Sequence, residues 1–403
     1  MRLEPQAAQP GRSLIRTLGW SIFLGCSWTW CIGMFLPVLL VRDLGAWGWV
    51  IFAAPNVVGA AAMGWVLRDA RASGRIVNHH AAACVAFSIV TIAFHVFFTL
   101  WFIPRLVGLP IAGVTFVLAA VYLIATGMKP GWDLPAAALV WAVSLAMFGI
   151  FVRRAGGAPF LPSPGVPGAG IAWLAPVCVF GFLFCPYLDL TFHRARQQTD
   201  RGHARVAFGV GFGVVFLAMI VFSLVYARRL APLIVPDWRR HLWPMLGGII
   251  AAHMIAQIAF TLAVHTRSAM TARTRGGAVL GLVVAAQVAL LLGVASWMLP
   301  RYHGLDFGEV VYRLFMGFYG LVFPAYVGIC MVPGRDGESG MSAAKLRALA
   351  LGVAVAAPMY WMGFVEGRMV WLVPGLAVVI LARFTVPKRQ GARRTDVRPL
   401  TGN

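Results

Sequence analysis

The chain has 403 residues, of which 60% are hydrophobic and only 12% are charged. Its mean hydropathy is +0.80, whereas a soluble globular domain carries about 25% charged residues. This composition excludes a water-soluble globular protein and a disordered one, so we expect most of the chain to lie in lipid. The net charge of +21 then requires an explanation other than nucleic-acid binding.

Long apolar runs dominate the sequence. A bilayer core of about 30 Å requires a helix of roughly 20 apolar residues. The runs predict an all-α polytopic membrane protein with about twelve transmembrane helices, numbered here in chain order, in a single integral membrane domain over 1–403. The predicted helices are 17–41, 46–67, 79–103, 108–127, 134–152, 169–192, 204–227, 243–265, 277–299, 308–332, 346–364 and 369–386.

The basic residues are unevenly divided between the two sides of these predicted helices. With the N-terminus inside, about two-thirds of the 34 Lys and Arg residues fall in cytoplasmic segments. This bias follows the positive-inside rule and predicts a multi-pass protein of the cytoplasmic membrane with both termini in the cytoplasm. The excess positive charge then contacts anionic lipid headgroups, and no nucleic-acid partner is expected. The exceptions on the outer side are Arg153, Arg154, Arg228, Arg229, Arg239 and Arg240.

Neither the N-terminal residues nor the cysteines point to a further function. The first 20 residues are polar and basic, and the apolar run after them is long enough to span, so no cleavable signal peptide is expected. The six cysteines all fall inside predicted helices, and their spacing fits neither a zinc ribbon nor a disulfide framework. We interpret them as small apolar packing residues.

A connector rich in proline and glycine, at about 153–168, divides the chain. We expect it to be a turn-rich segment at the outer face. It separates a first group of five predicted helices, 17–152, from a second group, 169–332. Two additional helices follow at 346–386.

Predicted helices 1 and 6 are interrupted near their middle by glycine and proline. Helix 1 contains Gly33 and Pro37, and helix 6 contains Gly181 and Pro186. Proline removes a backbone hydrogen bond, and in lipid the freed carbonyl groups must be satisfied by protein, water or an ion. Interrupted helices at matching places in two halves indicate a transport site. Five helices separate the two, so the repeats would be inverted in the membrane.

Two further features of the sequence concern the helices that follow the interrupted ones. Predicted helices 2 and 7 occupy matching places in the two halves. Predicted helices 2 and 7 are rich in small residues, which permits close helix approach. These residues are Asn56, Gly59, Ala60, Ala61, Ala62 and Gly64 in helix 2, and Ala207, Gly209, Gly211 and Gly213 in helix 7. The segment 230–243, which follows helix 7, is amphipathic and bounded by prolines. We expect it to form a surface hairpin or lid.

This pattern resembles the leucine-transporter fold of the amino acid–polyamine–organocation superfamily. The resemblance covers about residues 17–335. It implies a 5+5 inverted repeat with broken helices 1 and 6, an external hairpin between helices 7 and 8, and two added C-terminal helices. The stretch 185–195 is also faintly similar to a segment of sodium/solute symporters.

The resemblance also implies where the substrate would bind, namely between helices 1, 3, 6 and 8 near mid-membrane. In that fold, helix 8 hydroxyls commonly bind sodium. Here helix 8 offers Thr261 and Thr266 among apolar residues, which favours proton coupling or simple exchange over sodium coupling.

Asp189 is the acidic residue placed well inside a predicted helix, directly after the Pro186 break. A charged group in a bilayer is costly unless it is paired, so such a residue is a functional candidate. His193 follows four residues later, on the same helical face. One interpretation is that the pair carries a proton or binds a cation. The other is that Asp189 caps the second half-helix, while His193 and Arg194 anchor its end at the interface.

The remaining candidates lie in the helices expected to surround the site. His95 in helix 3 and His253 in helix 8, with Gln257 one turn later, either shuttle protons or hydrogen-bond the neighbouring backbone. Aromatic residues beside the two breaks can stack on a substrate. The complete set of candidate binding residues is Trp28, Trp30, Cys31, Gly33, His95, Gly181, Pro186, Tyr187, Asp189, His193, His253 and Gln257.

Arg313, near the outer start of helix 10, is a candidate for an outer gate. Asp306 and Glu309 are close enough in sequence to pair with it, so a purely structural ion pair is an equal interpretation.

Transport is the favoured function. Enzyme motifs such as a Walker sequence, HExxH or a Gly-x-Ser-x-Gly elbow are missing from the sequence, so we predict no enzymatic activity. We predict a secondary active transporter that moves a small neutral or zwitterionic organic solute by alternating access. No metal or cofactor is predicted apart from a coupling ion, H⁺ or Na⁺.

The alternatives are a membrane haem or quinone protein, in which His95 and His253 form one ligand pair, and a non-transporting membrane subunit. The oligomeric state does not follow from the sequence.

Overall fold

The part of the chain that its computed structural model describes is almost entirely helical. The described residues are 10–127, 129–155, 168–271, 275–332 and 341–386. Within them, nine helices are long and apolar enough to cross a membrane, and one bent helix pair passes the same test when taken together. An isolated β-bridge joins Tyr302 to Leu305 in a loop. The chain is therefore an all-helical, multi-pass membrane protein, while the total of twelve spans and the inverted repeat remain predictions.

The first group of predicted helices is present with one addition. An amphipathic helix, α4 (Ala70–His79), was not predicted because it is too short to span; Asp69 caps it by accepting a hydrogen bond from the Ala72 amide at 2.7 Å. The other elements are α1 (Pro10–Trp28), α2 (Cys31–Leu44), α3 (Ala46–Val66), α5 (Ala81–Val107), α6 (Ile111–Gly127), η1 (Pro130–Trp132) and α7 (Asp133–Arg154).

The second group contains more irregular helix than the first. Predicted helices 7 and 10 include the π-helical segments η3 (Gly211–Phe216), η6 (Phe318–Val322) and η7 (Val327–Met331). Around them lie α8 (Ala169–Phe184), η2 (Cys185–Leu188), α9 (Leu190–Gln197), α10 (Arg201–Val210), α11 (Leu217–Leu230), α12 (Pro244–Thr271), α13 (Arg275–Met298), α14 (Phe307–Gly317) and α15 (Phe323–Tyr326).

The connecting and C-terminal segments complete the fold. The predicted hairpin at 230–243 consists of two short 3₁₀ helices, η4 (Ala231–Ile234) and η5 (Trp238–His241). The last predicted helices are α16 (Ala343–Phe364), followed by η8 (Met369–Trp371), α17 (Leu372–Ala382) and η9 (Arg383–Thr385). Most of the predicted connector at 153–168 lies outside the described residues.

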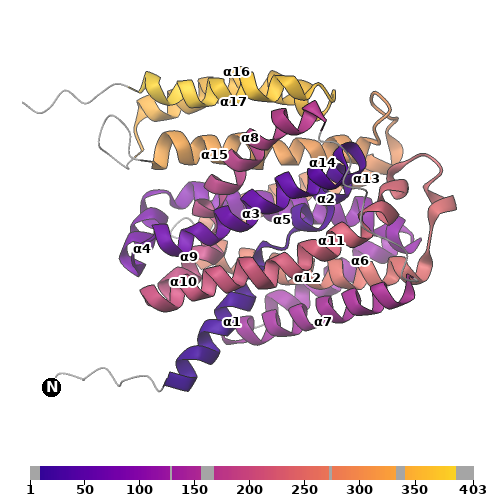
Figure 1. The fold of residues 1–403 in the computed structure, drawn as a ribbon, viewed down its shortest axis with the longest axis horizontal. Helices are drawn as coiled ribbons and strands as arrows, with labels where there is room; N and C mark the ends of the chain where they lie inside the picture. Colours follow the sequence, from indigo (N-terminus) through magenta and orange to yellow (C-terminus); the bar gives the residue numbers. More distant parts are fainter. Residues whose placement is uncertain (1–9, 128, 156–167, 272–274, 333–340, 387–403) are drawn as a thin grey trace, which may run out of the picture.

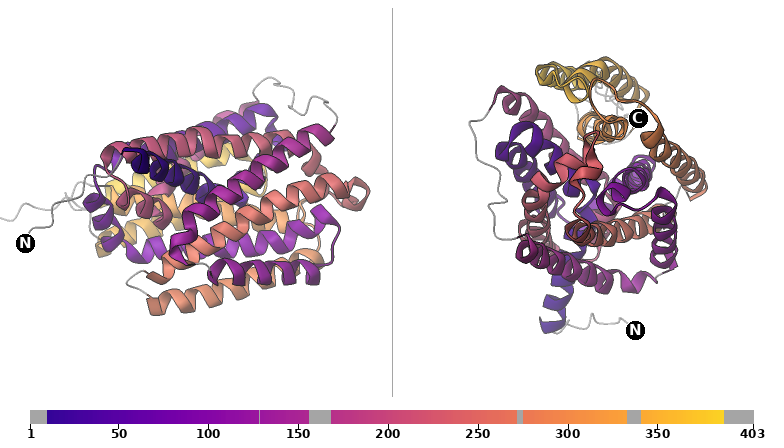
Figure 2. Two further views of the ribbon diagram at one scale, coloured as in Figure 1. Left: turned by 90° about the horizontal axis from the view of Figure 1, so that it is seen from below. Right: turned by 90° about the vertical axis from the view of Figure 1, so that its right-hand side faces the viewer.

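The long helices run roughly along one axis of the molecule (Figure 1). α16 and α17 pair as a layer at one edge and meet the rest of the bundle through α8, α14, α15, η6 and η7, while α1 and α7 lie at the opposite edge. The view along the axis shows the other helices gathered between these layers (Figure 2). We call the two ends of the bundle outer and inner after the predicted orientation; α2 ends at the outer end, and α4 and α9 lie at the inner end.

Glycines bring the small-residue helices onto the two broken ones. A Cβ added at Gly59 of α3 would lie 2.2 Å from the Phe182 carbonyl oxygen of α8, and one at Gly25 of α1 would lie 2.5 Å from the Val215 side chain of η3. Gly211 meets α1 just as closely, because a Cβ there would lie 2.8 Å from the Ser21 carbonyl oxygen. The absence of side chains at these positions therefore sets the distance between the broken helices and their neighbours.

Replacing Gly59 by valine should destabilise the protein by at least about 1–3 kcal/mol, because the new side chain meets rigid backbone and the helices must separate. Gly149→Val is the matched control, since nothing lies within 4 Å of a Cβ at that position of α7. Thermal unfolding of both variants in detergent measures the difference. Equal melting temperatures would show that α3 and α8 do not depend on this close contact.

Candidate functional site

The first helix break lies at Thr29 and Trp30, where α1 and α2 meet at a bend of 55°. It comes one turn before Gly33, and Pro37 lies inside α2, so the break is not at the glycine and proline that suggested it. Side chains replace the missing helical hydrogen bonds. The Thr29 hydroxyl donates to the Gly25 carbonyl oxygen at 2.8 Å, and the Trp30 indole donates to the Ser27 carbonyl oxygen.

The second break follows Pro186. The 3₁₀ turn η2 ends at Leu188, Asp189 is extended, and α9 begins at Leu190. One carboxylate oxygen of Asp189, Oδ1, accepts hydrogen bonds from the Thr191 amide and hydroxyl, each at 2.7 Å. Asp189 therefore caps α9. Its other oxygen, Oδ2, is buried and has no hydrogen-bond partner among the described residues.

The two breaks touch. The Thr191 hydroxyl lies 3.1 Å from the Ser27 hydroxyl, which joins the start of α9 to the last turn of α1. Trp28 packs against Phe192 with ring centroids 4.9 Å apart. Both contacts involve fully buried or nearly buried side chains. Two discontinuities far apart in sequence thus form one polar junction inside the bundle.

His193 does not pair with Asp189, although the four-residue spacing suggested it. The ring nitrogens of His193 contact the Ser73 hydroxyl and the Tyr187 carbonyl oxygen, each at 2.9 Å. The reason is local: α9 begins at Leu190, so the extended Asp189 lies outside the helical register that would align the two side chains. His193 instead ties α9 to α4, while Pro186 and Tyr187 form the turn between the half-helices.

His95 supports the first break. Its Nδ1 donates to the Thr91 carbonyl oxygen at 2.7 Å, which leaves Nε2 to accept a hydrogen bond from the Cys31 amide at 3.2 Å. That amide is one of the unsatisfied donors at the start of α2. Since both ring nitrogens are engaged, His95 does not present a free nitrogen for the ligand pair with His253 that a haem protein would require.

A buried polar stripe runs along α12. His253, Gln257, Thr261 and His265 are spaced four residues apart and are fully buried. The Gln257 amide donates to the Ser144 hydroxyl of α7 and contacts Met219 Sδ, each at 2.9 Å. Both ring nitrogens of His253, the amide oxygen of Gln257 and the Thr261 hydroxyl have no partner among the described residues. The stripe therefore offers unsatisfied groups beside the first break.

His265 was not among the predicted residues. Its Nδ1 lies 3.2 Å from the Ser88 hydroxyl, and its ring meets Trp30 edge-on with centroids 5.4 Å apart. The signal for it was the period of four residues that begins at His253 and Gln257. Thr266, one residue later, also has a hydroxyl without a partner in the described part of the chain.

A small cavity lies at the junction of the breaks, and we call it the break cavity. Its walls are Trp28, Trp30, Ile32, Gly33, Asn56, Phe182, Cys185 and Tyr319. It has room for about one water molecule, so the site is closed in this conformation. Three predicted residues line it, while Asn56, which accepts a 2.6 Å hydrogen bond from the Trp28 indole, and Tyr319 were not in the predicted set.

The other predicted residues do not line this cavity. The Cys31 carbonyl oxygen accepts a 3.0 Å hydrogen bond from the Tyr312 hydroxyl. Gly181 faces η6, where a Cβ would lie 2.8 Å from the Tyr319 carbonyl oxygen. His253 packs against Phe222 of α11, with ring centroids 5.1 Å apart.

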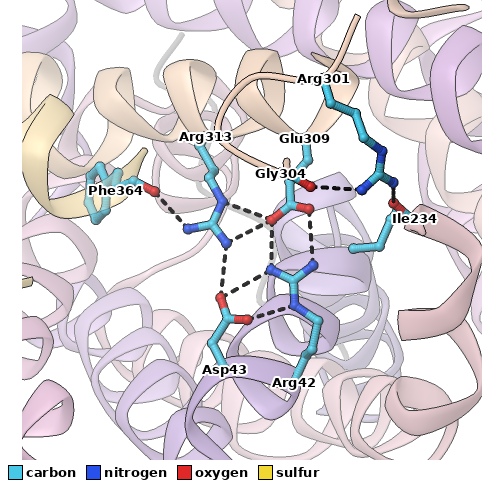
Figure 3. A network of polar contacts seen from close by, with 8 residues as sticks. All are labelled: Arg42, Asp43, Ile234, Arg301, Gly304, Glu309, Arg313 and Phe364. Atoms are coloured by element: carbon cyan, nitrogen blue, oxygen red, sulfur yellow. Dashed lines mark hydrogen bonds and ion pairs between the residues drawn. The ribbon is translucent and has the colours of Figure 1, made fainter. Parts of the chain in front are cut away.

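Four charged side chains form a cluster at the outer end (Figure 3). Arg42 and Asp43 come from the end of α2, and Glu309 and Arg313 come from α14. Both arginines donate to Glu309 at 2.7 Å, and Arg313 also reaches Asp43 at 2.9 Å. We call these four residues the outer cluster. The sequence suggested Asp306 as an equal partner for Arg313, but Asp306 pairs with Arg105 at 2.9 Å.

A second cluster of charged side chains joins three helices at the inner end. Asp133, at the start of α7, is 1% exposed and pairs with Arg194 of α9 at 2.5 Å and with Arg267 of α12. We call these three residues the inner cluster. It was not predicted; its weak signal in the sequence is an acidic residue directly before a predicted helix, at the side rich in basic residues.

No protein-family model matches the chain, and no curated protein is similar to it in sequence. Its function must therefore follow from the geometry of the site.

Proposed function

We propose that the protein is a secondary active transporter that moves a small organic solute across the membrane by alternating access. The observation that carries this proposal is the contact between two broken helices at Thr191 and Ser27. Half-helix ends inside a bilayer present backbone and side-chain polar groups that a solute or ion can bind. A purely structural subunit does not require two broken helices that meet at one closed cavity.

The two charge clusters fit the movement that alternating access requires. In our proposal, predicted helices 1, 2, 6 and 7 rock against the remaining helices. The outer cluster joins α2, which would move, to α14, which would stay. The inner cluster joins α9, which would move, to α7 and α12. Each cluster thus crosses the boundary between the two bodies and acts as a gate at its own end.

Asp189 is the proposed proton carrier. It is fully buried, forms no ion pair within the described part of the chain, and keeps one oxygen without a partner. Because an unpaired carboxylate is costly away from water, Asp189 would hold a proton in the closed state and release it when one end opens.

Proteoliposome uptake tests the proposal. A panel of metabolites is first screened for thermal stabilisation of the purified protein, because a ligand that binds the folded state raises its stability. Solutes that stabilise are then assayed for uptake with a proton gradient, with a sodium gradient, and with neither. We expect uptake that a proton gradient accelerates. Uptake that only sodium drives would contradict the role of Asp189 and favour Thr261 and Thr266. No uptake of any stabilising solute would contradict transport.

A further inference from the structure

A second, larger pocket lies beside the break cavity, and we call it the outer pocket. It has a volume of about 70 Å³ and lies between α2, α8, α14, α16 and α17. Its walls are almost entirely apolar and include Leu39, Val177, Met316 and Leu372. Charged groups enter it through Asp43 and Arg313 of the outer cluster. It shares Phe182 and Tyr319 with the break cavity, so these two side chains border both spaces.

A groove on the outside of the bundle lies next to this pocket. It has a volume of about 240 Å³ between α14, η6 and α16, and we call it the lateral groove. Leu314 and Phe318 line it and are 46% and 38% exposed, as expected for side chains that face lipid. Of the residues that line the lateral groove, Phe364 and Arg313 also line the outer pocket. The Phe364 side chain contacts Gly320, and its carbonyl oxygen accepts a 2.7 Å hydrogen bond from Arg313.

One polar group in the lateral groove has no partner. Tyr360 lines the groove and is 3% exposed, and its hydroxyl forms no hydrogen bond within the described residues. A buried hydroxyl without a partner costs free energy that a ligand with a donor or acceptor would recover. The lining of the groove is therefore apolar apart from Arg313, Trp361 and Tyr360, and of these Arg313 and Trp361 already form hydrogen bonds.

We infer that these spaces form a lateral access path by which an amphipathic solute enters from the outer leaflet of the membrane. The solute would leave the lipid through the lateral groove, pass Phe364 into the outer pocket, and reach the break cavity past Phe182 and Tyr319. Asp43 and Arg313 pair with each other at 2.9 Å and form a neutral ion pair in the wall of the pocket, which fits a zwitterionic or neutral polar head on an apolar body. This inference rests on the proposed function and specifies its substrate class.

Photolabelling of the protein in nanodiscs tests the path. The probe is a single-chain alkylphosphocholine that carries a diazirine on its chain, and labelled residues are identified by mass spectrometry. We expect labels on the lateral groove and on the outer pocket, at residues such as Phe318 and Met316. Labels confined to lipid-facing residues of α13, such as Leu280 and Leu291, which are 67% and 71% exposed, would overturn the inference.

Two substitutions in the path and one control make the test more specific. Ala357→Trp fills the lateral groove and should remove the labels from the outer pocket. Val355→Trp is the matched control on the same helix, because Val355 is 53% exposed and lines neither space. Phe364→Ala removes the barrier and should increase labelling of the pocket. Pocket labelling that neither Ala357→Trp nor Phe364→Ala alters would overturn the path.

A second probe separates a transported solute from a bound membrane lipid. A two-chain phosphatidylcholine with the same diazirine should not label the outer pocket, and equal labelling by both probes would overturn the inference. The proposed function is tested separately by uptake. If the pocket stays unlabelled while proteoliposomes take up a water-soluble solute, the lateral path is wrong and transport stands.

Discussion

Replacing Asp189 by asparagine should abolish uptake driven by a pH gradient while leaving the protein folded. An amide has nearly the shape of a carboxyl group but does not bind and release a proton in this pH range. Asparagine is as good a helix cap as aspartate, so the hydrogen bonds from Thr191 to Oδ1 are preserved. Solute uptake with and without a proton gradient, together with thermal unfolding, measures both parts of the prediction.

Asp189→Ala provides the control for the capping role. It removes the cap of α9 and should cost about 1 kcal/mol of stability, which Asp189→Asn should not. If the asparagine variant transports as fast as the parent in a pH gradient, Asp189 is only a cap and the proton is carried elsewhere.

Replacing Asp133 by asparagine should produce the largest loss of stability, about 3–5 kcal/mol, because it removes the buried partner of two arginines. Asp133 is 1% exposed, and the side chains of Arg194 and Arg267 are 32% and 16% exposed. The change leaves two positive charges at the junction of α7, α9 and α12 without their carboxylate. Denaturation of the purified variant measures this loss.

Asp200→Asn is the matched control for that change. The Asp200 carboxylate caps α10 and pairs with His203, but both side chains are well exposed. Exposed ion pairs contribute little to stability, and asparagine preserves the cap. A loss in Asp133→Asn no larger than in Asp200→Asn would show that the inner cluster does not hold the bundle together.

The positions of the helices could be predicted from the sequence because hydropathy is a local property of the chain. Each predicted helix range is largely helical in the described structure, and the two interruptions occur in the expected helices. Their positions were less accurate. Pro186 does precede the second break, but the first lies before Gly33, since Trp30, Thr29 and His95 satisfy the backbone there rather than at Pro37.

The candidate site was predicted only in part. Trp28, Trp30 and Gly33 line the break cavity, whereas Asn56 and Tyr319 join it from helices whose contacts the sequence did not specify. The expected Asp189–His193 pair is absent because a one-residue extension at Asp189 changes which way the side chain points. His265 could have been found from the period of four residues on α12, but its contact with Trp30 could not.

By itself, the sequence determined that this protein lies in a membrane, where its long helices run, and which two of them are interrupted. These properties depend on the cost of exposing backbone and polar groups to lipid, which is summed along short stretches of chain. Only the tertiary structure decided which polar groups meet. Arg42 and Glu309 are 267 residues apart, and Asp133 and Arg267 are 134 apart. In a low-dielectric interior every buried charge needs a partner, but helix packing alone determines which residue that partner is.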